Sequence, residues 1–215
     1  TQGIYNPNMR EIESYDAVLI LGEDLTQTAP RMALSVRQAA KNKAKEMAAK
    51  TRTPDWLAEP VQRIGQEAKS PIYILAATQT RLADVATGEV VASPNDIARL
   101  GFAVAAAVKG ETVSGLDDDA KAFAQTIADT LKAAKKPLII SGTSLQDPAI
   151  MEAAAQVAQN LGATAIRGFI LTAREFICPR KHLSRTQHGH RQQHTVSQLH
   201  FILLIQLKNI TKHIF

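Results

Sequence analysis

The sequence predicts an α/β protein with an open, mostly parallel sheet between two layers of helices. Short unbroken apolar runs have the length of strands that are buried on both faces. Amphipathic helical stretches separate these runs, and strands that alternate with helices pair in parallel. Ligands of such sheets bind beyond the carboxyl ends of the strands, so we expect any site near Gly22, Ala77 and Gly142.

Three apolar runs are expected to form strands, and a Gly or Pro starts or stops each of them. The runs are residues 17–21, 72–76 and 138–140. Unbroken apolar sequence is typical of strands that are covered on both faces. The stretch between residues 77 and 92 has an irregular pattern, which assigns no particular element to it.

The helices are expected where a proline or a capping residue precedes an apolar stripe of helical spacing. They should run from Pro30 through Met47, from Pro54 through Ile64, from Pro94 to Gly110, from Asp117 to Lys136, and from Pro148 to Gly162. The second of these is expected to bend or restart at Pro60, because proline disturbs a helix interior. Residues 23–29 should form a polar loop.

Composition divides the chain near residue 165. Residues 1–165 carry seventeen Lys and Arg against nineteen Asp and Glu, whereas residues 166–215 carry eight against one. All six histidines and the single cysteine lie in the second part. We therefore expect a partial α/β domain over residues 1–165 and a basic, His- and Gln-rich tail over residues 166–215, which is either disordered or foreign to the parent protein.

The single cysteine, Cys178, cannot form an internal disulfide, and alone it cannot hold an iron–sulfur cluster or a four-ligand zinc site. A reducing compartment fits this count. The longest apolar run, residues 201–207, is far shorter than the roughly 20 residues that a membrane-spanning helix needs. No secretory leader is expected, and the first residue, Thr1, indicates a cut inside a longer protein.

A resemblance to a known family is carried by the first strand and its flanks. Residues 3–24 (GIYNPNMREIESYDAVLILGED) resemble the G subunit of bacterial NADH-quinone oxidoreductase, respiratory complex I, within its molybdopterin-oxidoreductase-like region. Residues 36–39 (VRQA), 80–84 (TRLAD) and 98–103 (ARLGFA) continue the likeness, which is expected to run to about Gly162.

The resemblance implies a Rossmann-like fold, as in molybdopterin oxidoreductases. It implies a full-length subunit that carries electrons from NADH towards quinone through iron–sulfur clusters, which cysteines of an N-terminal portion hold. Those cysteines are absent here, so we expect a structural segment that has no cofactor and no activity of its own. Its expected partners are other domains of the same subunit and neighbouring complex I subunits, on the cytoplasmic side of the inner membrane, without a span or a specific nucleic acid.

The resemblance also points to the loop after the first strand. In pterin-carrying relatives this loop approaches a guanine-dinucleotide cofactor, whereas the complex I version is understood to have lost the pterin and kept the fold. Gly22, Glu23 and Asp24 are therefore the positions of a vestigial nucleotide contact. Two carboxylates there would repel a pyrophosphate.

The residues alone favour a plain role for this loop. Glu23 and Asp24 could act as an acid/base pair or bind magnesium, but adjacent carboxylates in such a loop are more often solvated turn residues. Gly22 and Gly142 lack the G-x-G-x-x-G spacing of a phosphate cradle. The acidic run 117–119 fits the start of a helix better than a cation site. No catalytic residue and no metal site are expected.

The tail offers weaker candidates. His188, His190 and His194, with Cys178 and His182 upstream, could bind zinc or nickel, although a solvated segment is the favoured interpretation. The basic stretch 180–191 could neutralise phosphates of nucleic acid or anionic lipid, but it lacks aromatic residues for stacking. Two alternative functions therefore remain open: a nucleotide- or dinucleotide-binding α/β module, and a basic-tailed protein that binds nucleic acid or a membrane surface.

Overall fold

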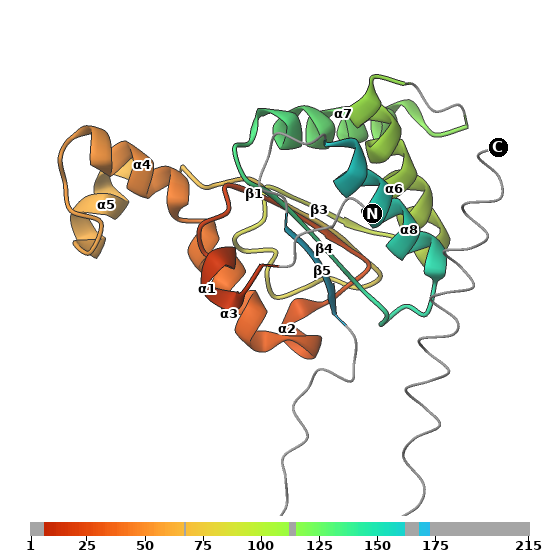
Figure 1. Cartoon of the computed structure of the whole chain (residues 1–215), viewed down its shortest axis with the longest axis horizontal. Coiled ribbons are helices and arrows are strands. Elements are labelled where there is room, and N and C mark those ends of the chain that lie inside the picture. Colours follow the sequence, from red (N-terminus) through yellow and green to blue (C-terminus); the bar gives the residue numbers. More distant parts are fainter. Residues whose placement is uncertain (1–6, 67, 112–114, 162–167, 173–215) are drawn as a thin grey trace, which may run out of the picture. The chain divides into compact units, whose positions relative to one another are not determined.

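The protein is built on a five-stranded sheet in the order β3-β2-β1-β4-β5, in which every neighbouring pair is parallel (Figure 1). The computed structural model describes residues 7–66, 68–111, 115–161 and 168–172. The strands are β1 Ala17–Leu21, β2 Ile72–Ala76, β3 Gly88–Val91, β4 Pro137–Gly142 and β5 Gly168–Thr172. The expected parallel α/β sheet is confirmed, and β3 is an additional strand within the stretch to which the irregular pattern assigned no element.

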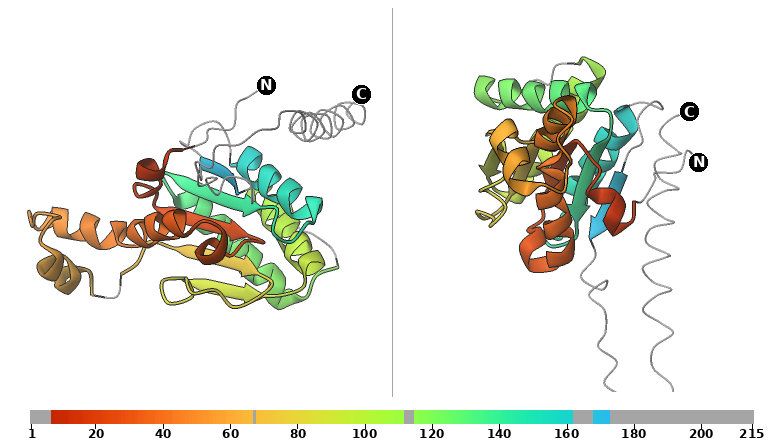
Figure 2. Two further views of the ribbon diagram at one scale, coloured as in Figure 1. Left: turned by 90° about the horizontal axis from the view of Figure 1, so that it is seen from below. Right: turned by 90° about the vertical axis from the view of Figure 1, so that its left-hand side faces the viewer.

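Helices cover both faces of this sheet (Figures 1 and 2). They are α1 Met9–Ile12, α2 Leu25–Thr28, α3 Pro30–Ala39, α4 Asn42–Lys50, α5 Ala58–Gly65, α6 Pro94–Lys109, α7 Asp118–Ala133 and α8 Pro148–Asn160. One apolar core lies between the sheet and α6, α7 and α8. A second core lies on the opposite face, under α1, α2 and α3. The two cores make the expected three layers.

Strand β1 shows why the strand sequences are apolar at every position. Leu19 and Leu21 belong to the core under α6 to α8, whereas Val18 and Ile20 belong to the core under α1 to α3. Successive side chains of a strand point to opposite faces, so a strand at the centre of three layers must be apolar throughout. All five residues of β1 are buried.

The expected helix from Pro30 through Met47 is broken in two. Helix α3 ends at Ala39 and α4 begins at Asn42. The Asn42 side-chain amide donates hydrogen bonds to the backbone carbonyls of Glu13, at 2.7 Å, and Tyr15, at 2.9 Å. Because these tertiary contacts hold the chain at the break, the apolar periodicity of the segment did not reveal it.

Two further local expectations need correction. The expected polar loop at 23–29 contains the helical turn α2, which Asp24 caps. Helix α5 begins at Ala58, so Pro54 does not start it, and Pro60 falls in its first turn. The first N–H groups of a helix have no partner within the helix, so a proline there costs no hydrogen bond and causes no restart. Helices α6 and α7 lie where they were expected.

The sheet continues past the expected domain boundary after residue 165. Strand β5 pairs with β4 in parallel, with Leu138 opposite Gly168 and Gly142 opposite Thr172. Residues 168–172, which fall within the expected tail, therefore belong to the sheet. The histidines of the tail, Cys178, the basic stretch 180–191 and the apolar run 201–207 all lie outside the described residues.

Candidate functional site at the carboxyl ends of β1 and β4

The strand order identifies one position in this sheet where a ligand would be expected. Strand β1 pairs with β2 on one side and with β4 on the other, so the connections that leave β1 and β4 diverge. In open parallel sheets, ligands bind where the direction of the connections reverses in this way. We call this position the switch point and define it by residues 22–24 after β1 and residues 143–147 after β4.

Gly22 opens the switch point and is required there for packing. Its backbone has a φ of +70°, a value that residues other than glycine rarely adopt. A Cβ on Gly22 would lie 2.8 Å from Cγ2 of Ile150, in the first turn of α8. The Gly22 N–H donates a hydrogen bond of 2.7 Å to the carbonyl of Leu75 at the end of β2. Helix α8 thus occupies the space next to this backbone.

Glu23 is buried, with 1% of its surface exposed. One carboxylate oxygen accepts a hydrogen bond of 2.5 Å from the Ser144 hydroxyl, and the other accepts a weaker one of 3.4 Å from the Ser144 N–H. The carboxylate therefore ties the loop after β1 to the loop after β4. The favoured interpretation of Glu23 as a solvated turn residue is wrong.

Asp24 has a local role. Its side chain accepts hydrogen bonds from the N–H of Thr26, at 3.0 Å, and from the Thr26 hydroxyl, at 2.6 Å. It is the N-cap of the four-residue helix α2. For Asp24, the interpretation as a turn residue agrees with the structure, and its carboxylate is directed to its own helix.

The residues that complete the switch point were not identified from the sequence. Ser144 supplies the partner of Glu23, and the Ser141 hydroxyl donates a hydrogen bond of 3.1 Å to the carbonyl of Leu21. Ile150 and Leu145 pack against the position of Gly22. The polar residues that directly follow the apolar run of β4 were the available signal. Their pairing across the two strands could not be read from the sequence.

This arrangement has a clear chemical consequence. The N–H and hydroxyl of Ser144 are donors at the switch point, and both are directed to Glu23. A carboxylate at the switch point repels a phosphate by simple Coulomb interaction, most strongly where water is excluded. The switch point as it stands offers a pyrophosphate neither free donors at Ser144 nor a favourable charge.

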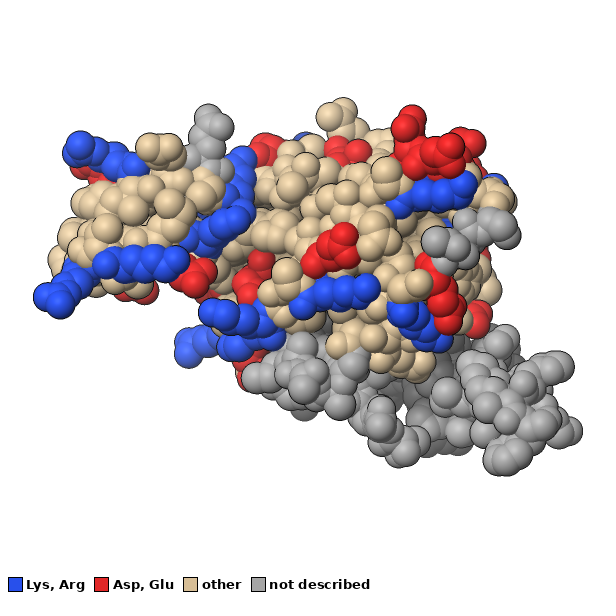
Figure 3. Space-filling view, turned by 90° about the horizontal axis from the view of Figure 1, so that it is seen from above, with Lys and Arg blue, Asp and Glu red and all other residues tan. Residues whose placement is uncertain are grey.

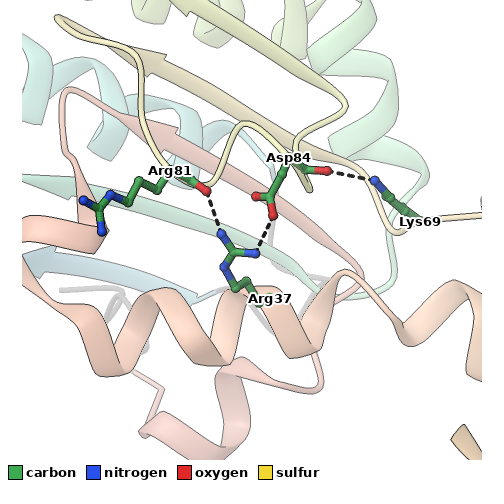
Figure 4. Close-up of polar contacts among 4 residues, drawn as sticks. All are labelled: Arg37, Lys69, Arg81 and Asp84. Carbon is green, nitrogen blue, oxygen red and sulfur yellow. Dashed lines mark hydrogen bonds and ion pairs between the residues drawn. The ribbon is translucent and has the colours of Figure 1, made fainter.

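A second polar cluster joins two of the stretches that carry the family resemblance (Figure 4). The Arg37 guanidinium on α3 forms an ion pair of 2.6 Å with Asp84 and donates a hydrogen bond of 2.6 Å to the carbonyl of Arg81. Lys69 donates a hydrogen bond of 2.9 Å to the carbonyl of Asp84. Arg37 thereby fixes the connection between β2 and β3 to α3, and its hydrogen bond lowers the pKa of Asp84.

The other acidic candidate is the start of α7. Asp117 is the N-cap residue without a capping hydrogen bond from its side chain, and Asp118 and Asp119 lie in the first turn. The hydrogen bond from Lys121 lowers the pKa of Asp118. Acidic residues at this end are stabilised by the helix dipole. In the described part of the chain, no three His, Cys, Asp or Glu residues are grouped to hold a metal ion.

Two known proteins that resemble this chain in sequence carry the same description. The G subunit of NADH-quinone oxidoreductase from Pseudomonas putida is 54% identical over 157 residues, which are 72% of this chain and 17% of the relative. The corresponding protein of Salmonella typhimurium is 49% identical over 175 residues, 80% of this chain and 19% of the relative. This chain matches one segment of the G subunit. No protein-family model matches it.

The resemblance to the G subunit drawn from residues 3–24 is therefore confirmed, and its extent is greater than expected. Four fifths of a 215-residue chain is 172 residues, so the match to the Salmonella protein extends to about residue 172 or beyond. It thus passes Gly162 and reaches β5. The chain nevertheless spans less than a fifth of the length of these relatives.

Two other findings complete the comparison. Among solved structures, the formyltransferase/hydrolase complex of Methylorubrum extorquens covers 79% of this chain and 40% of its own, with 16% identity and a TM-score of 0.44. A likeness at this level carries no argument about fold or function. Within the described residues, no helix has both the length and the apolar character that crossing a membrane requires.

Proposed function

We propose that this chain is a structural α/β segment of the G subunit of NADH-quinone oxidoreductase, with no catalytic or cofactor-binding role of its own. The match of 54% identity to one segment of that protein supports the assignment. In this proposal, the whole subunit carries electrons from NADH to quinone through iron–sulfur clusters that other segments hold. The segment described here provides a rigid domain against which those segments pack.

The observation that carries the structural role is the hydrogen bonding between Glu23 and Ser144. It uses both donors of Ser144 within the protein, at the position where a dinucleotide-binding sheet would present donors to phosphates. Ile150 packs at the same point, where it leaves no room for a Cβ on Gly22. We infer that Gly22, Glu23 and Asp24 are the remains of a nucleotide contact that now stabilises the fold.

The side chains of this segment also do not fit the cofactors of an electron carrier. An iron–sulfur cluster of the ferredoxin type requires four cysteine ligands, and the chain has one. That cysteine, Cys178, lies outside the described residues. The proposal therefore places the clusters in other parts of the G subunit.

The proposed partners follow from the length of the relatives. More than four fifths of the G subunit lies outside the matched segment in these relatives. We propose that this segment contacts other domains of the same polypeptide and neighbouring subunits of the complex. Its proposed location is the cytoplasmic side of the inner membrane, as a peripheral part of the complex.

A chimera tests this proposal. Residues 1–172 of this chain replace the matched segment in the G subunit of Pseudomonas putida, and NADH-quinone oxidoreductase activity is measured in membranes. A matched chimera carries Glu23→Gln, which keeps a hydrogen-bond acceptor and removes the charge. Both chimeras should retain activity, because the segment supplies structure and no reacting group. Loss of activity in the Glu23→Gln chimera, with normal amounts of assembled complex, would contradict a structural role.

A second candidate function is nucleotide binding, and two observations favour it. The strand order creates a switch point between β1 and β4, and Gly22 has the positive φ that phosphate-binding turns often use. Calorimetry of the full chain with NADH, GTP and a pterin guanine dinucleotide separates the two functions. The structural proposal expects no saturable heat with any of the three, for the wild type and for Glu23→Gln. Binding with one site per chain would establish the second function instead.

A further inference from the structure

Helices α4 and α5 form a hairpin that packs mainly on itself, and we call residues 41–66 the arm. The two helices touch so closely that a Cβ on Gly65 would overlap the Cβ of Ala44. Within the described residues, the side-chain hydrogen bonds and the ion pair that join the arm to the rest of the domain lie in the first half of α4. Asn42 bonds to the backbone of Tyr15, the Lys43 N–H bonds to the Ser70 hydroxyl, and Glu46 forms a long ion pair of 3.9 Å with Lys135. Figure 1 and the left-hand view of Figure 2 show the arm extending from the side of the sheet.

The turn between α4 and α5 presents the only tryptophan of the chain to solvent. Trp56 is 76% exposed. Single exposed apolar residues are common on protein surfaces and need no explanation by themselves. An exposed tryptophan is different, because tryptophan is enriched in protein interfaces. Its large rigid ring supplies much of the binding energy when it is buried against a partner. Trp56 belongs to neither of the two apolar cores, so its indole contributes little to the stability of the fold.

The arm is also basic, although the domain around it is not. It carries six Lys and Arg against three Asp and Glu, a net charge of +3, whereas residues 1–165 together have a net charge of −2. The six cations are Lys41, Lys43, Lys45, Lys50, Arg52 and Arg63. Within the described residues, none of the six side chains forms an ion pair or a hydrogen bond. Figure 3 shows Lys and Arg side chains spread over this lobe of the surface.

We infer that the arm docks on an acidic face of another part of the G subunit, with Trp56 inserted in an apolar pocket and the surrounding cations paired with carboxylates. This inference rests on the proposed function. Aromatic anchors at the centre and charged residues at the rim are the usual composition of protein interfaces. The net positive charge of the arm favours a negative partner surface.

The length of the relatives identifies the occupant as the same polypeptide. More than four fifths of the G subunit lies outside this segment. A domain of the same chain is present at high effective concentration, so one anchor and a charged rim are sufficient for stable docking. An anionic membrane is the weaker candidate, because Asp55 and Glu59 lie beside Trp56 and would be repelled from it. A folded protein surface can provide cations for these two carboxylates.

The fluorescence of Trp56 tests the inference directly, since no other tryptophan contributes to the signal. The probes are the two flanking segments of the Pseudomonas putida G subunit, expressed separately without tryptophan and checked for folding by circular dichroism. The full chain should bind one of them with a blue shift of its emission and protection from acrylamide quenching. Affinity should fall with added salt, because the rim contacts are ionic.

Variants separate the anchor from the rim. Trp56→Ala should weaken binding at least about tenfold in a calorimetric titration, as expected for an interface hot spot. Lys50→Gln with Arg52→Gln should weaken it less and should reduce its salt dependence. Leu34→Ala and Lys109→Gln are matched controls, since both side chains are exposed on other helices, and they should change nothing. Unchanged binding of Trp56→Ala would overturn the inference.

Two further results would also overturn it. One is a blue shift with phosphatidylglycerol vesicles and none with either segment, because the arm would then bind lipid. The other uses the active chimera, which needs no isolated segments: Trp56→Ala within it should reduce the assembled complex on native gels. Full assembly of that variant would refute the docking role and leave the proposed function standing. Failure of the unmodified chimera would instead refute the proposed function.

Discussion

Glu23 and Ser144 are 121 positions apart in the chain, yet the Ser144 hydroxyl and N–H both donate hydrogen bonds to the Glu23 carboxylate. The contact joins the end of β1, the central strand of the sheet, to the end of its neighbour β4. Glu23 is buried whereas Ser144 is exposed, so the carboxylate depends on Ser144 for its hydrogen bonds more than Ser144 depends on the carboxylate. The first prediction concerns this pair.

Glu23→Ala should lower the free energy of unfolding by roughly 1–3 kcal/mol, because it removes the hydrogen bonds to a charged acceptor that tie the loop after β1 to the loop after β4. Glu23→Gln should cost less, since its amide oxygen can still accept. Urea denaturation followed by circular dichroism measures both changes. Glu111→Ala, at an exposed position after α6, is the control and should have little effect. Equal stability of Glu23→Ala and Glu111→Ala would show that the pair contributes nothing.

Gly22→Ala should destabilise the protein for two separable reasons. The positive φ strains any side chain, and the new Cβ would lie 2.8 Å from Cγ2 of Ile150. Gly110→Ala is a matched control, since Gly110 has a φ of +87° and nothing within 4 Å of its Cβ position. Backbone strain alone costs about 1–3 kcal/mol. Thermal denaturation should therefore show a larger loss for Gly22→Ala than for Gly110→Ala, and the reverse order would refute close packing at the switch point.

The ion pair between Arg37 and Asp84 predicts a pH effect with a definite sign. The hydrogen bond from Arg37 depresses the pKa of Asp84 below its usual 3.8 in the folded protein. Its contribution to stability is therefore present above pH 3.8 and is lost as the pH falls through the lower folded value. Both side chains are partly exposed, so high salt should weaken the effect.

NMR titration of the carboxyl carbons checks this prediction. In Arg37→Gln, the pKa of Asp84 should rise towards its usual value. The pKa of Asp118 should stay low in the same sample, because its hydrogen bond comes from Lys121. If the Asp84 midpoint does not move in the Arg37→Gln variant, the contact seen in Figure 4 does not persist in solution.

Truncation tests where the folded domain ends. A chain that stops at residue 172 keeps β5 and should retain the Tm of the full chain. A chain that stops at residue 165 loses β5 and exposes the edge of β4, so its Tm should fall by several degrees and it should aggregate more readily. Identical Tm values for the two truncations would restore the boundary at residue 165.

Strands β1, β2 and β4 could be predicted from the sequence because a strand that is buried on both faces has an unbroken apolar run. Every residue of β1, β2 and β4 is buried, and each apolar run was recognised as a strand. Strand β3 was missed because it pairs only with β2 among the described strands, and its residues are half-buried or exposed. A half-covered strand of four residues has neither an unbroken apolar run nor a long alternation.

At the switch point, the sequence predicted the position of the residues but only part of their roles. The position of Gly22, Glu23 and Asp24 at the end of the first strand was correctly expected, because a glycine stops the apolar run. Their roles differ, since Asp24 caps the turn that follows it whereas Glu23 pairs with Ser144. A helix cap involves residues that are adjacent in the sequence, so it can be predicted from the local sequence. A contact between loops more than a hundred residues apart depends on the strand order.

The most direct test of the account follows the amide signals of Gly22 and Ser144 by NMR while NADH or GTP is added to the full chain. Both amides bond within the protein, Gly22 to Leu75 and Ser144 to Glu23, so we predict that neither signal moves at millimolar nucleotide. Saturable shifts of these two signals would contradict the account, because they would place a bound nucleotide at the switch point.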